Sequence, residues 1–270
     1  MASPNTYSGG AGGASGADLA TVSPLIMSGS VVYLDSDTGD DSYTGLERVK
    51  PVATLAQAIT NSSNNGVISV FANHQETLTA KQTISLTGLS IVGEGTGSNR
   101  PKFTRNVDDE LFDVTGAGLL LDNLYFVASG TSSTNGRVRI ASADTEIYNC
   151  YFECGANDDG PSVEYITGAG QARIEETMFV STASLVTAQP DSAIKVTNAM
   201  SDLRLKSVTL DGGDTGWAHP YAVNGAAAVT RLRALNVHLL NDSDVTLATG
   251  TVGYFHPGNT SGSARLVWAS

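Results

Sequence analysis

Several features that define common protein classes are scarce in this chain of 270 residues. Its two cysteines, Cys150 and Cys154, are too few for a disulfide framework and lack the partners of a metal site. With 15 Lys and Arg against 27 Asp and Glu, the net charge of −12 disfavours contact with nucleic acid phosphates or anionic lipid. We therefore expect neither nucleic acid nor a membrane among its partners.

Long apolar runs are also missing. No run is long enough to span a membrane. The first residues, Met1 to Tyr7, lack the basic and apolar regions of a secretory signal peptide. We expect Cys150 to be a buried thiol and Cys154 a second free thiol, which favours folding in a reducing cytoplasm.

What the chain has in abundance is an internal repeat. Eight-residue segments with one pattern recur 26 to 31 residues apart, at 119–126, 145–152, 172–179, 203–210 and 232–239. The first, third, sixth and eighth places of each segment are mostly apolar, and the others are mostly polar. This alternation predicts two short strands joined by a tight corner, with the apolar places facing inward.

A further strand precedes most of these segments, at 111–114, 138–140, 163–166 and 194–196, and glycine-rich turns such as 115–118 separate the two. Three strands and three corners in about 27 residues make one rung of a parallel β-helix, whose stacked rungs share a continuous core. A sandwich or barrel would show hairpin turns without such a period, and a doubly wound sheet would need intervening helices. The sequence predicts an all-β, single-stranded parallel β-helix.

Only the segment from Pro51 to Thr60 has helical spacing, with Leu55, Ala58 and Ile59 on one face. We expect this short helix to cap the open end of the first rung. The domain prediction is an N-terminal arm at 1–30 and a β-helix domain at 31–270, with its cap at about 31–66.

The N-terminal arm contains a glycine-rich tract followed by a short apolar stretch. Such a tract cannot form a core of its own. It either docks on a neighbouring chain or larger assembly, or folds back on the capping helix. We expect its partner contacts at Leu19, Val22, Leu25, Ile26 and Met27.

The segments from Val31 to Gly45 and from Pro51 to Ile59 resemble the opening of the pectate-lyase-like right-handed β-helix superfamily. In that group a strand, a Gly-Asp-Asp turn, a second glycine and a Thr-Leu-x-x-Ala-Ile helix lead into the first rung. The resemblance implies a right-handed β-helix. It implies little about function, because the superfamily includes polysaccharide lyases, glycoside hydrolases, phage tailspikes and other virion proteins.

Lyases of this fold use clustered aspartates for calcium with a basic residue nearby, and the hydrolases use two or three carboxylates in a cleft. The acidic runs within the rungs of this chain, 108–110 and 157–159, fall between strands, where solvated loops are expected. The run from Asp35 to Asp41 does not match an EF-hand and is typical of an Asp- and Gly-rich turn. A weak calcium site there is the alternative. We predict no catalytic residues, metal ligands or cofactor.

The four histidines, His74, His219, His238 and His256, show no metal-ligand spacing. His219 and His256 each precede a proline and are expected in loops, and His238 is expected to point outward from a strand.

The second place of successive repeats forms one outward column, with Leu120, Glu146, Arg173, Arg204 and Arg233. One interpretation is a solvated strip with a modest ion pair. The other is a partner-binding surface at Arg173, Arg204 and Arg233, because like charges at rung spacing repel unless something acidic faces them.

These observations favour a structural virion protein of a tailed bacteriophage, most simply a capsid decoration or auxiliary protein anchored by its arm, and not an enzyme. We expect it to fold in the host cytoplasm and to contact other virion proteins, the major capsid protein first, with a homotrimer as one assembly state. The alternative is a tailspike-type protein that binds a host surface glycan or degrades polysaccharide as a lyase or hydrolase.

Overall fold

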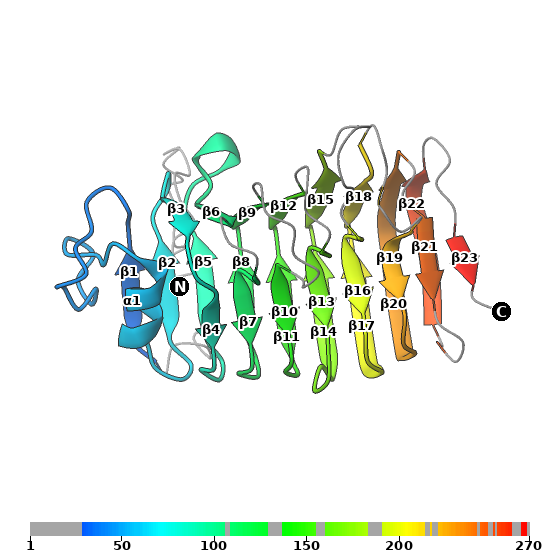
Figure 1. The fold of residues 1–270 in the computed structure, drawn as a ribbon, viewed down its shortest axis with the longest axis horizontal. Coiled ribbons are helices and arrows are strands. Elements are labelled where there is room, and N and C mark those ends of the chain that lie inside the picture. Colours follow the sequence, from blue (N-terminus) through cyan, green and yellow to red (C-terminus); the bar gives the residue numbers. More distant parts are fainter. Residues whose placement is uncertain are drawn as a thin grey trace, which may run out of the picture.

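The computed structural model describes residues 29–268 except for 106–108, 129–136, 155–159, 183–190, 214–216, 218–220, 242–243, 248–250, 252 and 261–265. Its strands stack as successive rungs along one axis, from β1 at one end to β23 at the other (Figure 1). Every strand pair in this stack is parallel. The predicted fold class, a parallel β-helix, is confirmed.

The strands form three faces. The first face holds, in order, β1 (Val31–Leu34), β2 (Val67–Val70), β5 (Ser90–Gly93), β8 (Leu120–Asp122), β11 (Thr145–Tyr148), β14 (Gln171–Glu175), β17 (Met200–Lys206) and β20 (Val229–Leu240). The second holds β3 (Gln75–Leu78), β6 (Lys102–Arg105), β9 (Tyr125–Ala128), β12 (Tyr151–Cys154), β15 (Met178–Ser181) and β18 (Thr209–Asp211). The third holds β4 (Gln82–Ile84), β7 (Phe112–Val114), β10 (Val138–Ile140), β13 (Val163–Tyr165), β16 (Ile194–Val196), β19 (Tyr221–Gly225), β21 (Asp244–Leu247) and β23 (Leu266–Trp268).

The first two faces are joined by β20, which pairs with both β17 and β18. Its twelve residues therefore continue around the corner that separates the two faces in earlier rungs. The next strand, β22 (Gly253–Thr260), pairs along β20 with two register shifts. His256 and Pro257 lie in β22, so the expectation of a loop there is wrong; proline is compatible with a strand that carries bulges.

The register between rungs is the one that the repeat predicts. Ile147 pairs with Ile174, and Ile174 with Leu205, so equal places of the repeat stack on one another. At the first, third, sixth and eighth places the side chains are at most 7% exposed in all five copies. The preceding strands at 111–114, 138–140, 163–166 and 194–196 are confirmed as β7, β10, β13 and β16, which begin or end within a residue of the expected bounds.

The tight corner between the two strands of each repeat lies at the fifth place. That residue has a positive φ of 49° to 56° in every copy: Asn123, Asn149, Glu176, Ser207 and Asn236. Asparagine tolerates this left-handed conformation better than most residues because its short side chain hydrogen-bonds locally. Here the Asn149 amide also donates to Asn123 Oδ1 at 3.3 Å, which ties one corner to the next.

The core is a column of stacked side chains. At the eighth place Phe126, Phe152 and Phe179 lie one above another, with ring centroids 4.7 and 4.8 Å apart and nearly parallel planes. Phe103 extends this stack toward the N-terminal end at 6.2 Å. All four rings are fully buried.

The helix α1 (Leu55–Asn61) lies beside β1 at the N-terminal end of the stack (Figure 1). Leu55 and Ala58 are fully buried in the common core, and Ile59 packs against it, as expected of a cap. The helix starts four residues later than predicted because Val52 pairs with the first strand instead. The Val52 N–H donates to Tyr33 O, and the Val52 carbonyl accepts from Asp35 N–H, both at 2.9 Å.

The start of α1 is set by Thr54, whose Oγ1 accepts from Gln57 N–H at 3.3 Å. Thr54 and Gln57 match the pattern of a capping box, a signal that was present in the sequence. In the described part of the chain, none of the helices is long and apolar enough to cross a membrane.

We predict that Phe152→Ala lowers the free energy of unfolding by about 3–5 kcal/mol, because it opens a cavity in the middle of the aromatic stack. Thr209→Ser, at an outward and only partly buried position of β18, is the control and should cost less than about 0.5 kcal/mol. Denaturant titration of both variants tests the register, and equal losses would contradict it.

A candidate interaction face

The predicted partner-binding residues divide into two groups. Leu19, Val22, Leu25, Ile26 and Met27 lie outside the described residues. Arg173, Arg204 and Arg233 are described, on β14, β17 and β20. Strand pairing places Arg173 opposite Arg204 and Arg204 opposite Arg233, so the three form the expected column on the outside of the first face.

Carboxylates from the same face stand between these arginines. Glu146 Oε1 lies 3.2 Å from Arg173, and Glu175 Oε1 lies 3.3 Å from Arg204 Nε. Asp202 Oδ2 lies 2.7 Å from an Nη atom of Arg233. The acidic groups that the column needs to avoid repulsion are therefore supplied largely by the β-helix itself. The prediction that the column binds a partner remains a prediction.

A shallow hollow of about 100 Å³ lies over this column. Arg173, Arg204 and Arg233 line it together with Glu146 and Asp144. Two further depressions adjoin it toward the N-terminal end, and Glu146 lines all three. The first face thus carries one elongated depression across several rungs, bordered by charged side chains of both signs.

Asp122, at the end of β8, lies in this depression and is partly buried. Burial raises the pKa of its carboxyl to about 6, and the nearby Glu176 adds to the rise, while Arg100 opposes it. A carboxyl whose pKa is higher in the folded than in the unfolded state is held more stably when protonated. Its contribution to stability is therefore present at about pH 4 and is lost as the pH rises through about 6.

We expect Asp122→Asn to remove this pH dependence. Relative to the unsubstituted protein, the free energy of unfolding of the variant should rise by on the order of 1 kcal/mol between about pH 4 and pH 7, after allowance for screening by solvent. Glu146→Gln is the matched control, because its exposed carboxylate is paired with Arg173. Denaturant titrations across this pH range measure the difference, and parallel curves for Asp122→Asn and the unsubstituted protein would contradict it.

The acidic run at 108–110 is only partly described, since Asp108 lies outside the described residues. The expectation of a solvated loop is wrong for Glu110, which is 2% exposed. Its carboxylate is flanked by Lys81 at 3.7 Å and Arg139 at 3.4 Å, and burial raises its pKa. The negative charge of Glu110 is compensated by cations from β10 and from the turn before β4. The alternation of apolar and polar residues within single strands does not indicate this contact. The run at 157–159 lies outside the described residues.

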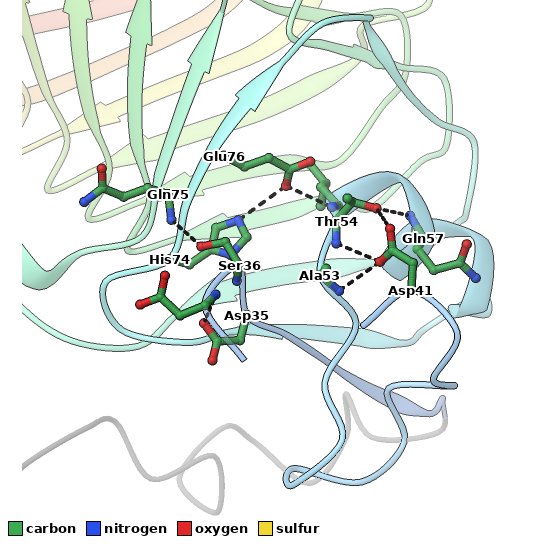
Figure 2. A network of polar contacts seen from close by, with 11 residues as sticks. Asp35, Ser36, Asp41, Ala53, Thr54, Gln57, His74, Gln75 and Glu76 are labelled. Carbon is green, nitrogen blue, oxygen red and sulfur yellow. Dashed lines mark hydrogen bonds and ion pairs between the residues drawn. The ribbon is translucent and has the colours of Figure 1, made fainter. Parts of the chain in front are cut away.

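The run from Asp35 to Asp41 is a turn whose carboxylates serve the backbone and the cap. Asp35 accepts from Asp37 N–H and from Thr38 Oγ1. Asp41 accepts from the N–H groups of Ala53 and Thr54, at 2.8 and 2.9 Å, and so fixes the segment that leads into α1 (Figure 2). Among the described residues, no group of three or more His, Cys, Asp or Glu side chains is placed to hold a metal ion.

His74 belongs to the same network and is fully buried, which the sequence pattern did not indicate. Its Nδ1 accepts from Ser36 N–H at 2.9 Å, and its Nε2 faces Glu76 at 3.3 Å (Figure 2). Glu76 in turn accepts from Leu55 N–H, the first residue of α1. His74 therefore links the turn that begins at Asp35 to the start of the cap. His238 lies on β20, partly buried, and His219 is outside the described residues.

Both cysteines are free and buried. Burial raises the pKa of Cys150 to about 12, so its thiol stays protonated and packs as a small apolar group. Cys154 Sγ lies 2.9 Å from Ser162 Oγ.

The second face carries an aromatic pair at the seventh place of the repeat. Tyr125 and Tyr151 meet edge to face with centroids 4.9 Å apart, and Lys102 Nζ lies 5.6 Å above the Tyr125 ring. The Tyr125 hydroxyl donates to Glu153 on the next rung, and burial with this hydrogen bond raises the pKa of Tyr125. These outward side chains stabilise one another from rung to rung.

No protein-family model matches the sequence, and no curated protein matches it. Among solved structures, the chain is similar to one described as pectate lyase Pel9A. The match has 12% sequence identity and a TM-score of 0.48, and it covers 89% of this chain and 78% of that one. A likeness of this size carries no inference about activity.

Proposed function

We propose that this chain is a structural protein of a tailed bacteriophage virion, most simply a capsid decoration or auxiliary protein. In this proposal the β-helix is the displayed body, and the arm at 1–30 anchors it to other virion proteins, the major capsid protein first. The protein folds in the host cytoplasm before it is assembled.

The observation that carries the proposal is the state of the carboxylates on the first face. Glu146, Glu175 and Asp202 each form an ion pair with an arginine on the same or a neighbouring rung. Carboxylates for acid–base chemistry need to be within hydrogen-bond reach of a substrate. Carboxylates held between cations instead favour a stable, displayed surface.

The N-terminal end of the stack has a cap of its own, which is consistent with an anchoring role for the arm. Leu55 and Ala58 of α1 are fully buried over the first rung, so the helix covers this end of the core. A segment that the fold does not need for closure can serve as an anchor. Asp18 is the only charged residue in the arm, so its binding would come from apolar contacts and backbone hydrogen bonds.

We predict that a variant without residues 1–28 folds but no longer attaches to virions of the phage that encodes it. Circular dichroism tests folding, and co-sedimentation with particles tests attachment. The full chain with Leu25→Asp and Ile26→Asp is a second variant that should lose most attachment, because both changes place charge on the apolar stretch.

The matched control replaces Arg173, Arg204 and Arg233 together by glutamine in the full chain and should still attach. If the truncated variant stays bound while this control dissociates, the body and not the arm is the anchor.

A second candidate function is glycan binding or cleavage, as in a tailspike-type protein. The elongated depression on the first face favours it, because the half-exposed ring of Tyr148 and the partly buried carboxyl of Asp122 both line it. An aromatic ring beside a carboxyl of raised pKa is an arrangement that could contact a sugar and donate a proton.

Under the proposed function, we expect no product release from a panel of capsular and pectic glycans, with or without Ca²⁺. Reducing-end and unsaturated-product assays measure this. If the protein releases product and this activity disappears in Asp122→Asn, or in the Asp158→Asn, Asp159→Asn double variant, the protein is a glycan-cleaving enzyme and the proposed structural function is wrong.

A further inference from the structure

Charge is distributed unevenly along the first face. Before β14 on this face, the charged outward residues of β8, of β11 and of the turn that leads from β10 into β11 are all acidic: Asp122, Asp144 and Glu146. At its C-terminal side, the first half of β20 carries Arg231 and Arg233. The two strands between them, β14 and β17, carry both signs.

The strands at the two sides match place by place. Asp144 and Arg231 each precede the first place of their repeat, Glu146 and Arg233 occupy the second place, and Tyr148 and Leu235 occupy the fourth. Tyr148 and Leu235 are 38% and 41% exposed, and they belong to the few large apolar side chains that are exposed in the described structure. At each of these places one strand therefore has an acidic residue where the other has a basic one, or an exposed ring where the other has an exposed aliphatic side chain.

We propose that the first face is a self-complementary surface whose partner is a second copy of this chain, in a two-fold dimer with antiparallel β-helix axes. The two-fold axis lies in the plane of the face, parallel to the strands, between β14 and β17. Rotation about this axis keeps each residue's place along the strand and reverses the order of the rungs. It therefore sets β11 of one copy against β20 of the other.

In this arrangement Asp144 faces Arg231, Glu146 faces Arg233, and Tyr148 faces Leu235, each contact occurring twice by symmetry. At the centre β14 faces β17, so that Glu175 meets Lys206. Arg173 meets Arg204 there, but both already lie within 3.6 Å of Glu175.

Charge also decides between the two possible orientations. A two-fold axis parallel to the β-helix axis would set each rung against its own copy with the strand direction reversed. With that axis over the second places, Glu146 meets Glu146 and Arg233 meets Arg233. Like charges placed opposite one another across an interface strongly disfavour association. Only the antiparallel arrangement joins the acidic side to the basic side.

The area of the first face indicates how tightly the two copies should bind. Six strands, β8, β11, β14, β17, β20 and the β22 that pairs along β20, lie at about 4.8 Å spacing, and about five residues of 3.3 Å from each give roughly 475 Å² per copy. The total of about 950 Å² is below the usual range of stable interfaces. The dimer is therefore weak, forms at high protein concentration and weakens as salt screens its ion pairs.

The exposure of these side chains makes them suitable for substitution. The side chains of Glu146, Arg231 and Arg233 are 48%, 64% and 52% exposed, so changes there should leave the core intact. This inference concerns the body and goes beyond the proposed function, since it holds whether or not the arm anchors the chain.

The test is analytical ultracentrifugation of the full chain at several protein concentrations, in about 20 mM and about 500 mM salt. We expect dimers at low salt and mainly monomers at high salt. Glu146→Arg and Arg233→Glu should each weaken association at least about tenfold. The double variant, which exchanges the two charges, should restore it.

Lys50→Glu is the matched control, because it reverses an exposed charge near the cap and β1, outside the rungs from β8 to β20, and should leave association unchanged. Leu235→Ser removes an exposed apolar contact without changing charge and should also weaken the dimer. Circular dichroism verifies that each variant is folded.

The proposal is overturned if the unsubstituted chain remains monomeric at low salt and high concentration, or if it forms trimers. It is also overturned if the double variant associates as weakly as either single variant.

Discussion

Stacking of equal places from rung to rung is the constraint on which the whole molecule depends. A single rung of three short strands cannot bury its own apolar side chains, so each must lie on an identical place above and below. The buried rings of Phe126, Phe152 and Phe179 are the clearest case. The same register that aligns these rings inside also aligns Arg173, Arg204 and Arg233 outside, so the core dictates the layout of the surface.

This coupling explains why so much of the fold was predictable from the sequence. Side chains alternate between inside and outside along a strand, so a repeat of apolar places identifies both the strands and their register. The column of arginines followed directly from that register. The fifth place of the repeat was also readable, since asparagine occupies it in three of five copies and suits a left-handed corner.

The features that were not predicted depend on contacts between residues that do not occupy equal places of the repeat. Glu110 is buried because Lys81 and Arg139, from two other rungs, lie beside it. His74 is buried because its ring lies against Phe103 and accepts a hydrogen bond from Ser36. The helix starts late because Val52 pairs with the first strand. The ion pair of Glu146 with Arg173 followed from the column itself, but Glu175 and Asp202 come from neighbouring places, and the column alone does not predict them.

The aromatic stack described above has a consequence for how stability is spread along the chain. Phenylalanine occupies the eighth place in three successive rungs, and leucine replaces it at Leu210 and Leu239. In a linear array each rung is stabilised only by its neighbours, so local stability follows local packing. Rungs with stacked rings should open last, and those with leucine earlier, so that amide exchange slows toward the phenylalanine stack. The free energy of local opening should therefore differ from rung to rung, and it should be greatest in the middle of the aromatic column.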